Sequence, residues 1–192
     1  MDPDEKRQVL RDFNHRINND LNALLAFIKL QRRFEMDEGQ IITSSCVVIA
    51  SISAIQNMMY GSDDAENRIS VAESFNEFKK ILNDYYDVQF TAQVEGDFSM
   101  NPKKMFHLLF LINEMVSLSN DISFNGAGDD RIDFRIEQNG GECILIYSDN
   151  GKGIGDAISK PDKRTVLFEQ LKKQIDATLD VNDSDVCVKF DL

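Results

Sequence analysis

Apolar positions in the first 60 residues recur at intervals of three and four, which is the period of an amphipathic α-helix. One apolar line consists of Leu10, Phe13, Ile17, Leu21, Leu24 and Ile28. A second line consists of Ile41, Val48, Ile52, Ile55 and Met59. The polar residues 37–39 (Asp-Glu-Gly) separate the two lines. The pattern therefore predicts two long helices with a short connection, which is an antiparallel helical hairpin.

A single hairpin of this kind has an apolar stripe on each helix and cannot bury both stripes by itself. Two copies of the hairpin bury their stripes together when they assemble as a four-helix bundle. We therefore expect a homodimer in which each protomer contributes one hairpin to the bundle.

A polar, turn-rich segment at residues 60–68 marks the expected end of the hairpin. We expect a helical domain over residues 1–62 and a second domain over residues 63–192. In the second domain, helices are predicted over 71–86, 102–119 and 163–177, and strands over 87–96, 130–138, 142–149, 178–183 and 185–192. Residues 138–142 (Gln-Asn-Gly-Gly-Glu) are typical of a hairpin turn. The chain as a whole is predicted to be α+β, with an α/β sandwich as its second domain.

The charge of the chain narrows its possible partners. Acidic residues outnumber basic ones by 33 to 21, which gives a net charge of -12. Such a surface repels phosphate backbones, so general nucleic-acid binding is not expected.

No uninterrupted apolar run reaches the roughly 18 residues that a membrane span needs. The first residues are acidic and polar, unlike a secretory signal, so we expect a cytoplasmic protein with no membrane segment.

The cysteines and histidines do not form a metal-binding pattern. Cys46, Cys143 and Cys187 are far apart, and each lies in an apolar stretch. This pattern favours buried free thiols in a reducing compartment. The chain has only two histidines, neither of which is close to a cysteine in the sequence. We therefore predict no metal site.

His15 lies on the polar side of the first predicted helix. At about 100° per residue, it falls roughly opposite Ile17, and its own side carries Arg11 and Asn19. Two interpretations stay open: an ordinary surface histidine, or a nucleophile that carries a phosphoryl group held by the guanidinium and amides. The helix is locally basic, which fits a phosphate site and a solvated face equally well. His107 lies between apolar residues and is expected to be half-buried and hydrogen-bonded.

Residues 147–155 (Tyr-Ser-Asp-Asn-Gly-Lys-Gly-Ile-Gly) form a glycine-rich segment directly after a predicted strand. Glycines at 151, 153 and 155 allow a backbone to approach a ligand closely, and Asp149 can accept a hydrogen bond from an amine. A tight turn with no ligand explains the same residues, so the segment alone leaves the choice open.

These two motifs together resemble the core of a bacterial sensor histidine kinase. The closest subfamily has a phosphoacceptor box that reads H-R-x-K-N-N-L and ends in L-Q-x-R. Matching positions are His15, Arg16, Asn19, Leu21, Leu30, Gln31 and Arg33. Asn18 and Asp20 replace the lysine and the asparagine that are usual in the subfamily. The resemblance covers nearly the whole chain, as a phosphoacceptor and dimerisation hairpin followed by an ATPase-like domain of the gyrase, chaperone and kinase superfamily.

The resemblance also implies a role for each matching residue. His15 is the expected phosphoacceptor, with Arg11, Arg16 and Asn19 beside it. Residues expected to contact nucleotide are Asn113 and Glu114, at the start of the N-box, and Asp149, Gly151 and Gly153, in the adenine-side box.

The sequence departs from the kinase pattern at the phosphate end of this site. The position of the family's Mg²⁺-binding asparagine is Leu118, which has no oxygen for a hard cation. Asp121 stands where the family has a lysine or histidine, and residues 165–168 (Thr-Val-Leu-Phe) replace a Gly-x-Gly turn. Phosphoryl transfer from ATP depends on charge neutralisation at this end. The sequence therefore predicts a vestigial nucleotide site, with ATP and Mg²⁺ as doubtful cofactors.

Three functions remain at this point. The preferred one is a histidine phosphotransferase that passes a phosphoryl group between His15 and aspartates of response-regulator receiver domains, as two-domain phosphotransferases of bacterial phosphorelays do. The second is a histidine autokinase that uses ATP, and the third is a non-catalytic dimeric binding module. The first is preferred because the histidine box is better preserved than the site that would supply it with phosphate.

Overall fold

A computed structural model of the chain describes most of its residues. The described residues are 8, 18–19, 21–22, 24–33, 37–61, 68–126, 128–159, 163–182 and 185–192. Three predicted site residues, Arg11, His15 and Arg16, lie outside them. The expected domain boundary at 62 and 63 also lies outside them. The described part contains all the predicted residues of the glycine-rich segment and of the N-box.

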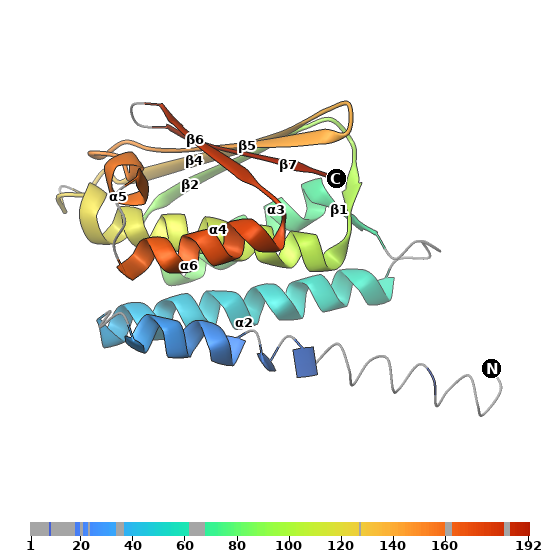
Figure 1. Ribbon diagram of the computed structural model, residues 1–192, viewed down its shortest axis with the longest axis horizontal. Coiled ribbons are helices and arrows are strands. Elements are labelled where there is room, and N and C mark those ends of the chain that lie inside the picture. The colour runs from blue at the N-terminus through green and yellow to red at the C-terminus, as the bar shows by residue number, and fades with distance from the viewer. Residues whose placement is uncertain are drawn as a thin grey trace.

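The molecule is arranged in three layers (Figure 1). The two helices of the hairpin form one outer layer, and a sheet forms the other. Three helices lie between them: α3 (Val71–Tyr85), α4 (Pro102–Leu118) and α6 (Lys163–Gln174). The sheet therefore has its helices on one face only, as the alternation of elements in the sequence predicts.

The main sheet has five strands in the order β2-β4-β5-β7-β6. These strands are β2 (Gln89–Glu95), β4 (Arg131–Asn139), β5 (Glu142–Asp149), β6 (Thr178–Asn182) and β7 (Asp185–Asp191). Only β2 and β4 pair in parallel, because α4 lies between them in the chain, and the other pairs are antiparallel. Buried residues alternate with exposed or partly exposed ones along β4, β5 and β7, so one face of the sheet forms the core.

α4 is the central helix of the molecule. Its N-terminus is capped by Asn101, whose side chain accepts a hydrogen bond from the N–H of Lys103 at 2.9 Å. All residues from Leu108 to Leu118 are buried, since the helix lies between other elements on both sides. His107, six residues after the cap, is partly buried, and its Nδ1 lies 2.7 Å from the backbone oxygen of Lys103. The prediction of a half-buried, hydrogen-bonded His107 is confirmed.

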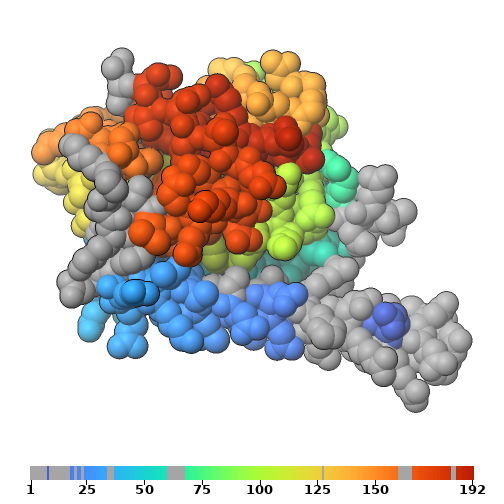
Figure 2. Space-filling view, viewed as in Figure 1, coloured from blue at the N-terminus to red at the C-terminus, as the bar shows by residue number. Residues whose placement is uncertain are grey.

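The hairpin consists of a first helix, described continuously over 24–33, and α2 (Glu38–Gly61). Leu24 and Phe27 are buried, and the ring of Phe27 lies 5.2 Å from that of Phe110 in α4. The helix α4 therefore covers one face of the hairpin, a contact that the sequence did not predict. Leu21, which the sequence places in the apolar stripe, is 50% exposed. Figure 2 shows the first helix, in blue, on the outside of the molecule.

α2 also has the length and composition of a membrane span. Residues Glu38–Met59 have a mean hydropathy of 1.6, and they form the one such helix among the residues that the structure describes. The core helix of a water-soluble protein meets the same criterion, and α2 has buried serines and packs against α3 and α4. Length and composition alone thus do not distinguish these two environments for α2.

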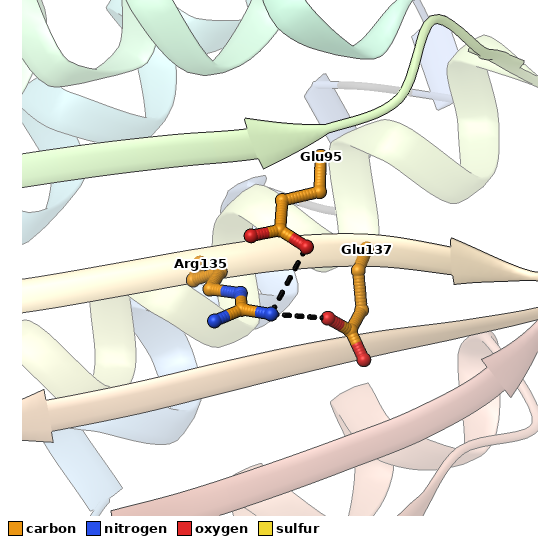
Figure 3. A network of polar contacts seen from close by, with 3 residues as sticks. All are labelled: Glu95, Arg135 and Glu137. Carbon is orange, nitrogen blue, oxygen red and sulfur yellow. Dashed lines mark hydrogen bonds and ion pairs between the residues drawn. The ribbon is translucent and has the colours of Figure 1, made fainter.

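The outer face of the sheet carries a small ion-pair network (Figure 3). Arg135 of β4 lies 3.0 Å from Glu95 of β2 and 2.6 Å from Glu137 of its own strand. The pair with Glu95 connects the two parallel strands across their outer face, and the pair with Glu137 lies within β4. Both pairs are open to water, which screens the attraction between the charges, so the network contributes little to stability.

Several short elements, and the partial exposure of two cysteines, were not predicted. The structure adds β1 (Ile69–Ser70), β3 (Ser99–Met100), α5 (Gly155–Ser159) and the π-helical turn η1 (Ser119–Ser123). All three cysteines are free, as predicted, but only Cys143 is fully buried. Cys187 is partly exposed because it alternates with buried residues along β7 and so lies on the outer face of the sheet. Cys46 is partly exposed on the hairpin.

Candidate functional site

The carboxylate of Asp149, at the end of β5, is held by hydrogen bonds from its own chain. Ser119 Oγ donates to Oδ2 at 2.7 Å, and Ser123 Oγ donates to Oδ1 at 2.5 Å. The backbone N–H groups of Gly151 and Gly153 also donate to Oδ1, at 2.9 and 3.3 Å. Asp149 is 8% exposed. Both oxygens that the sequence offers to an adenine amine are therefore engaged within the protein.

The glycine-rich segment lies directly against η1. Lys152 N–H donates to the backbone oxygen of Ser123 at 3.1 Å, and Gly153 N–H donates to Ser123 Oγ at 2.9 Å. A Cβ at Gly151 would lie 2.4 Å from Ser123 Oγ and 2.5 Å from the Ser123 backbone oxygen. Gly151 thus permits η1 to approach the glycine-rich segment closely. The resemblance implies that a nucleotide, and not η1, approaches this glycine.

A buried tyrosine extends this cluster into the core. The hydroxyl of Tyr147 lies 2.8 Å from Ser119 Oγ, which in turn donates to Asp149. Burial raises the pKa of Tyr147 well above its ordinary value because the phenolate would lose its hydration. The neutral phenol is thus a stable hydrogen-bonding partner within the fold.

Asn113 lies in a second cluster, which faces the hairpin. Its Nδ2 donates to Ser44 Oγ at 2.8 Å and to the Ser44 backbone oxygen at 3.4 Å, while its Oδ1 accepts from Tyr86 at 3.2 Å. Burial, and secondly the nearby Glu114 carboxylate, raise the pKa of Tyr86 above its ordinary range, so Tyr86 remains a donor. Asn113 is 1% exposed and joins α4 to α2 and to the end of α3.

Glu114 joins the same cluster together with a residue of the phosphoacceptor box. Gln31 Nε2 donates to Glu114 Oε1 at 3.3 Å and to Ser44 Oγ at 3.1 Å, and Ser44 Oγ donates to Glu114 Oε1 at 3.4 Å. The sequence marks Gln31 only as a match to the L-Q-x-R end of the histidine box. Ser44 has no sequence signal beyond being a polar residue in an apolar helix. The sequence assigned neither residue to this cluster, and it also did not identify Tyr86 as the donor to Asn113.

The predicted residues around His15 are described only in part. Asn19 is exposed, as are Asn18 and Asn22 on the same predicted side of the helix. Leu21 of the predicted apolar stripe is exposed as well, so the exposure of the asparagines does not test the predicted helical phase. The role of Asn19 beside the phosphoacceptor remains a prediction, as do the roles of Arg11, His15 and Arg16.

The described residues do not fit an ATP–Mg²⁺ group. Leu118 is buried at the position of the family's metal ligand and has no donor oxygen. Asn113 is bonded to the hairpin, and Asp149 is bonded to η1. No catalytic step through ATP can be derived from such an arrangement.

Comparisons with known proteins agree with this fold. Residues 12–86 match the HisKA_2 family, described as histidine kinase. The chain is 22% identical over 181 residues to the sensor histidine kinase PdtaS of two Mycobacterium tuberculosis strains. That alignment includes 91% of this chain but only 36% of the relative's length.

Two solved structures of one kinase share the fold. The histidine kinase domain of the blue-light activated histidine kinase of Erythrobacter litoralis is 13% identical and superposes with a TM-score of 0.65, covering 94% of each chain. Another structure of that kinase is 15% identical with a TM-score of 0.68, covering 95% of this chain and 62% of the other. At these identities the likeness establishes the fold alone.

The family match over residues 12–86 and the fold shared with solved structures make this chain similar to the histidine kinases of two-component signalling. More specifically, its helical hairpin followed by an α/β sandwich is similar to the core of a sensor histidine kinase.

Proposed function

We propose that this protein is a histidine phosphotransferase of a two-component phosphorelay, with His15 as its phosphoacceptor. The observation that carries the proposal is the engagement of Asp149 and Asn113 within the chain. A kinase needs the corresponding groups for nucleotide and metal, whereas a phosphotransferase does not. The phosphoryl group then comes from an aspartyl phosphate of a receiver domain and returns to an aspartate.

The proposed phosphoryl transfer requires few groups from this chain. A nitrogen of the neutral His15 imidazole attacks the phosphorus of the aspartyl phosphate, so a P–N bond forms while the P–O bond breaks. The aspartate carboxylate leaves with the bonding electron pair, and the imidazole releases a proton to solvent. The receiver supplies its own carboxylates and Mg²⁺, and Arg11, Arg16 and Asn19 hold the phosphate oxygens. The reverse reaction returns the group to a receiver.

The direct test is transfer from a labelled receiver. A panel of receiver domains is phosphorylated with radiolabelled acetyl phosphate, freed of the donor and mixed with the protein. We expect acid-labile label on this chain, none on a His15→Ala variant, and full labelling of the matched control His107→Ala. Absence of label from every receiver, or label that survives His15→Ala, would overturn the proposal.

A histidine autokinase is the second candidate, because the curated relatives are sensor histidine kinases. It is tested by incubation with radiolabelled ATP and Mg²⁺ and by calorimetric titration with ATP and ADP. Under our proposal neither self-labelling nor binding heat is seen. Robust self-labelling at His15 would replace the phosphotransferase with the autokinase.

We also propose that the working unit is a cytoplasmic homodimer. Part of the hairpin surface that the second domain leaves uncovered is apolar. The exposed residues are Leu21, Leu25, Ile42 and Ile49. A second hairpin that packs on them would complete a four-helix bundle. The receiver domain is the proposed second partner.

A further inference from the structure

The contact between the hairpin and the second domain has a polar centre. Phe27 and Phe110 provide an apolar contact, while Gln31, Ser44 and Asn113 form a buried hydrogen-bonded group with Glu114 beside it. Gln31 and Ser44 have no exposed surface. Two apolar surfaces slide over one another at little cost, whereas buried hydrogen bonds fix one relative position.

Ser44 is the centre of this group, because it uses all the hydrogen-bonding capacity of a hydroxyl. Its oxygen accepts from Asn113 at 2.8 Å and from Gln31 at 3.1 Å, and its proton is donated to Glu114 at 3.4 Å. A hydroxyl has one donor and two acceptor positions. Two of the three partners, Asn113 and Glu114, belong to α4 of the second domain, and Gln31 belongs to the first helix.

A second polar connection lies near the first. Gln40, one turn before Ser44 in α2, donates from Nε2 to Asp121 Oδ1 of η1 at 2.7 Å. Both connections thus lie in the first two turns of α2, at the loop end of the hairpin. Two separate polar contacts at one end restrict rotation of the hairpin on the second domain.

We propose that Ser44, together with Asn113, is a positioning residue that holds the phosphoacceptor hairpin in one orientation on the second domain. The inference rests on the proposed phosphotransfer to His15. In this arrangement a receiver domain contacts the hairpin and the second domain at the same time. A preformed composite surface binds more tightly than one that has to be ordered on binding, because less conformational entropy is lost.

The test compares two buried serines of α2. Among the residues that the structure describes, Ser51 donates only to the backbone oxygen of Val47 in its own helix, so Ser51→Ala is the matched control for Ser44→Ala. For Ser44→Ala we expect the receiver concentration at half-maximal transfer to rise roughly five- to tenfold. The transfer rate at saturation stays unchanged, since the receiver supplies the chemistry. Partial unfolding of the variant would instead lower the maximal transfer rate and leave the receiver concentration at half-maximal transfer unchanged.

Hydrogen–deuterium exchange of the same variants gives a readout that does not depend on phosphate. We expect faster exchange of the amides of residues 38–45 in Ser44→Ala than in Ser51→Ala. Asn113→Ala is the second variant, and the double variant with Ser44→Ala is expected to be less than additive in both readouts.

The positioning role would be overturned if Ser44→Ala and Asn113→Ala matched Ser51→Ala in two measurements. These are the amide exchange rates of residues 38–45 and the receiver concentration at half-maximal transfer. Wild-type protein that accepts no phosphate would overturn the proposed function instead. The exchange comparison would still decide whether Ser44 fixes the hairpin.

Discussion

At the scale of single residues, Gly151 lies so close to η1 that no side chain fits there. In Gly151→Ala, the new Cβ meets the backbone of Ser123 as well as its hydroxyl, so a side-chain rotation cannot relieve the clash. We expect the free energy of unfolding to fall by about 1–3 kcal/mol. Urea unfolding followed by circular dichroism measures this change.

The control for this prediction is Gly141→Ala. A Cβ at Gly141 has no neighbour within 4 Å, and Gly141 does not have positive φ. Its unfolding free energy is expected to stay near that of the wild type. Equal stability of the two variants would show that the close contact between Gly151 and Ser123 does not form in solution.

Cys143 is expected to be the least reactive thiol of the chain. Burial raises its pKa to about 11, although Lys104 and Arg68 lower it in part. The reactive thiolate therefore forms only as the pH rises toward that value, and the neutral thiol is present at lower pH. We expect slow alkylation of native Cys143 by iodoacetamide at pH 8, measured for each cysteine by mass spectrometry.

The urea-unfolded protein provides the comparison for this prediction. There Cys143 is expected to react as fast as Cys46 and Cys187, because the burial is lost. Alkylation of native Cys143 at pH 8 at the unfolded rate would contradict the raised pKa and the buried position in β5.

At this scale the sequence named the residues of the candidate site, but not the partners that those residues contact. The sequence identified Asp149 as a hydrogen-bond acceptor in a glycine-rich segment that follows a predicted strand. Its hydroxyl donors, Ser119 and Ser123, lie 30 and 26 residues earlier in the chain. Such a partner is determined by packing, so no local pattern reveals it. For the same reason the sequence did not assign Ser44 to the site.

At the scale of elements, α4 depends on the cap at its start. Asn101→Ala removes the side-chain acceptor of the Lys103 N–H, and we expect a loss of about 1 kcal/mol in unfolding free energy. Asn101→Asp keeps an acceptor at the cap and is expected to remain close to the wild type. Thermal and urea unfolding of the two variants check this, and equal losses would show that the cap bond does not stabilise α4.

The long elements were predicted well because their periodicity extends over many residues. α3 was predicted over 71–86 and forms over Val71–Tyr85. β1 and β3 have two residues each, which is too short for any period. The helix predicted over 102–119 includes only the first residue of η1 (Ser119–Ser123). A π-helical turn has no composition of its own, and this one arises where the chain closes on Asp149.

At the scale of the whole molecule, the hairpin has two apolar surfaces with different partners. One packs on α4, as Phe27 does, and the other includes Ile42 and Ile49, which are 64% and 49% exposed. We expect Ile49→Glu to convert the proposed dimer to a monomer of 21.9 kDa in sedimentation experiments. A charge at the dimer interface would lose its hydration on association.

The matched control for this substitution lies on another element. Val166 of α6 is 46% exposed and lies outside the hairpin, so Val166→Glu is expected to leave the dimer intact. A wild-type protein that sediments as a monomer would contradict the homodimer. Dissociation by both variants would contradict the assignment of the interface to the hairpin.

The sequence by itself determined the α+β class, the length and order of the long elements, and the histidine box with its degenerate nucleotide motifs. These are local properties, since periodicity and motif spacing depend on neighbours along the chain. Only the tertiary structure decided that α4 covers one face of the hairpin, that Asn113 and Glu114 turn toward Ser44 and Gln31, and that η1 satisfies Asp149. Hydrogen bonds between residues 26 to 83 positions apart depend on how the elements pack, which a pattern along the chain does not encode.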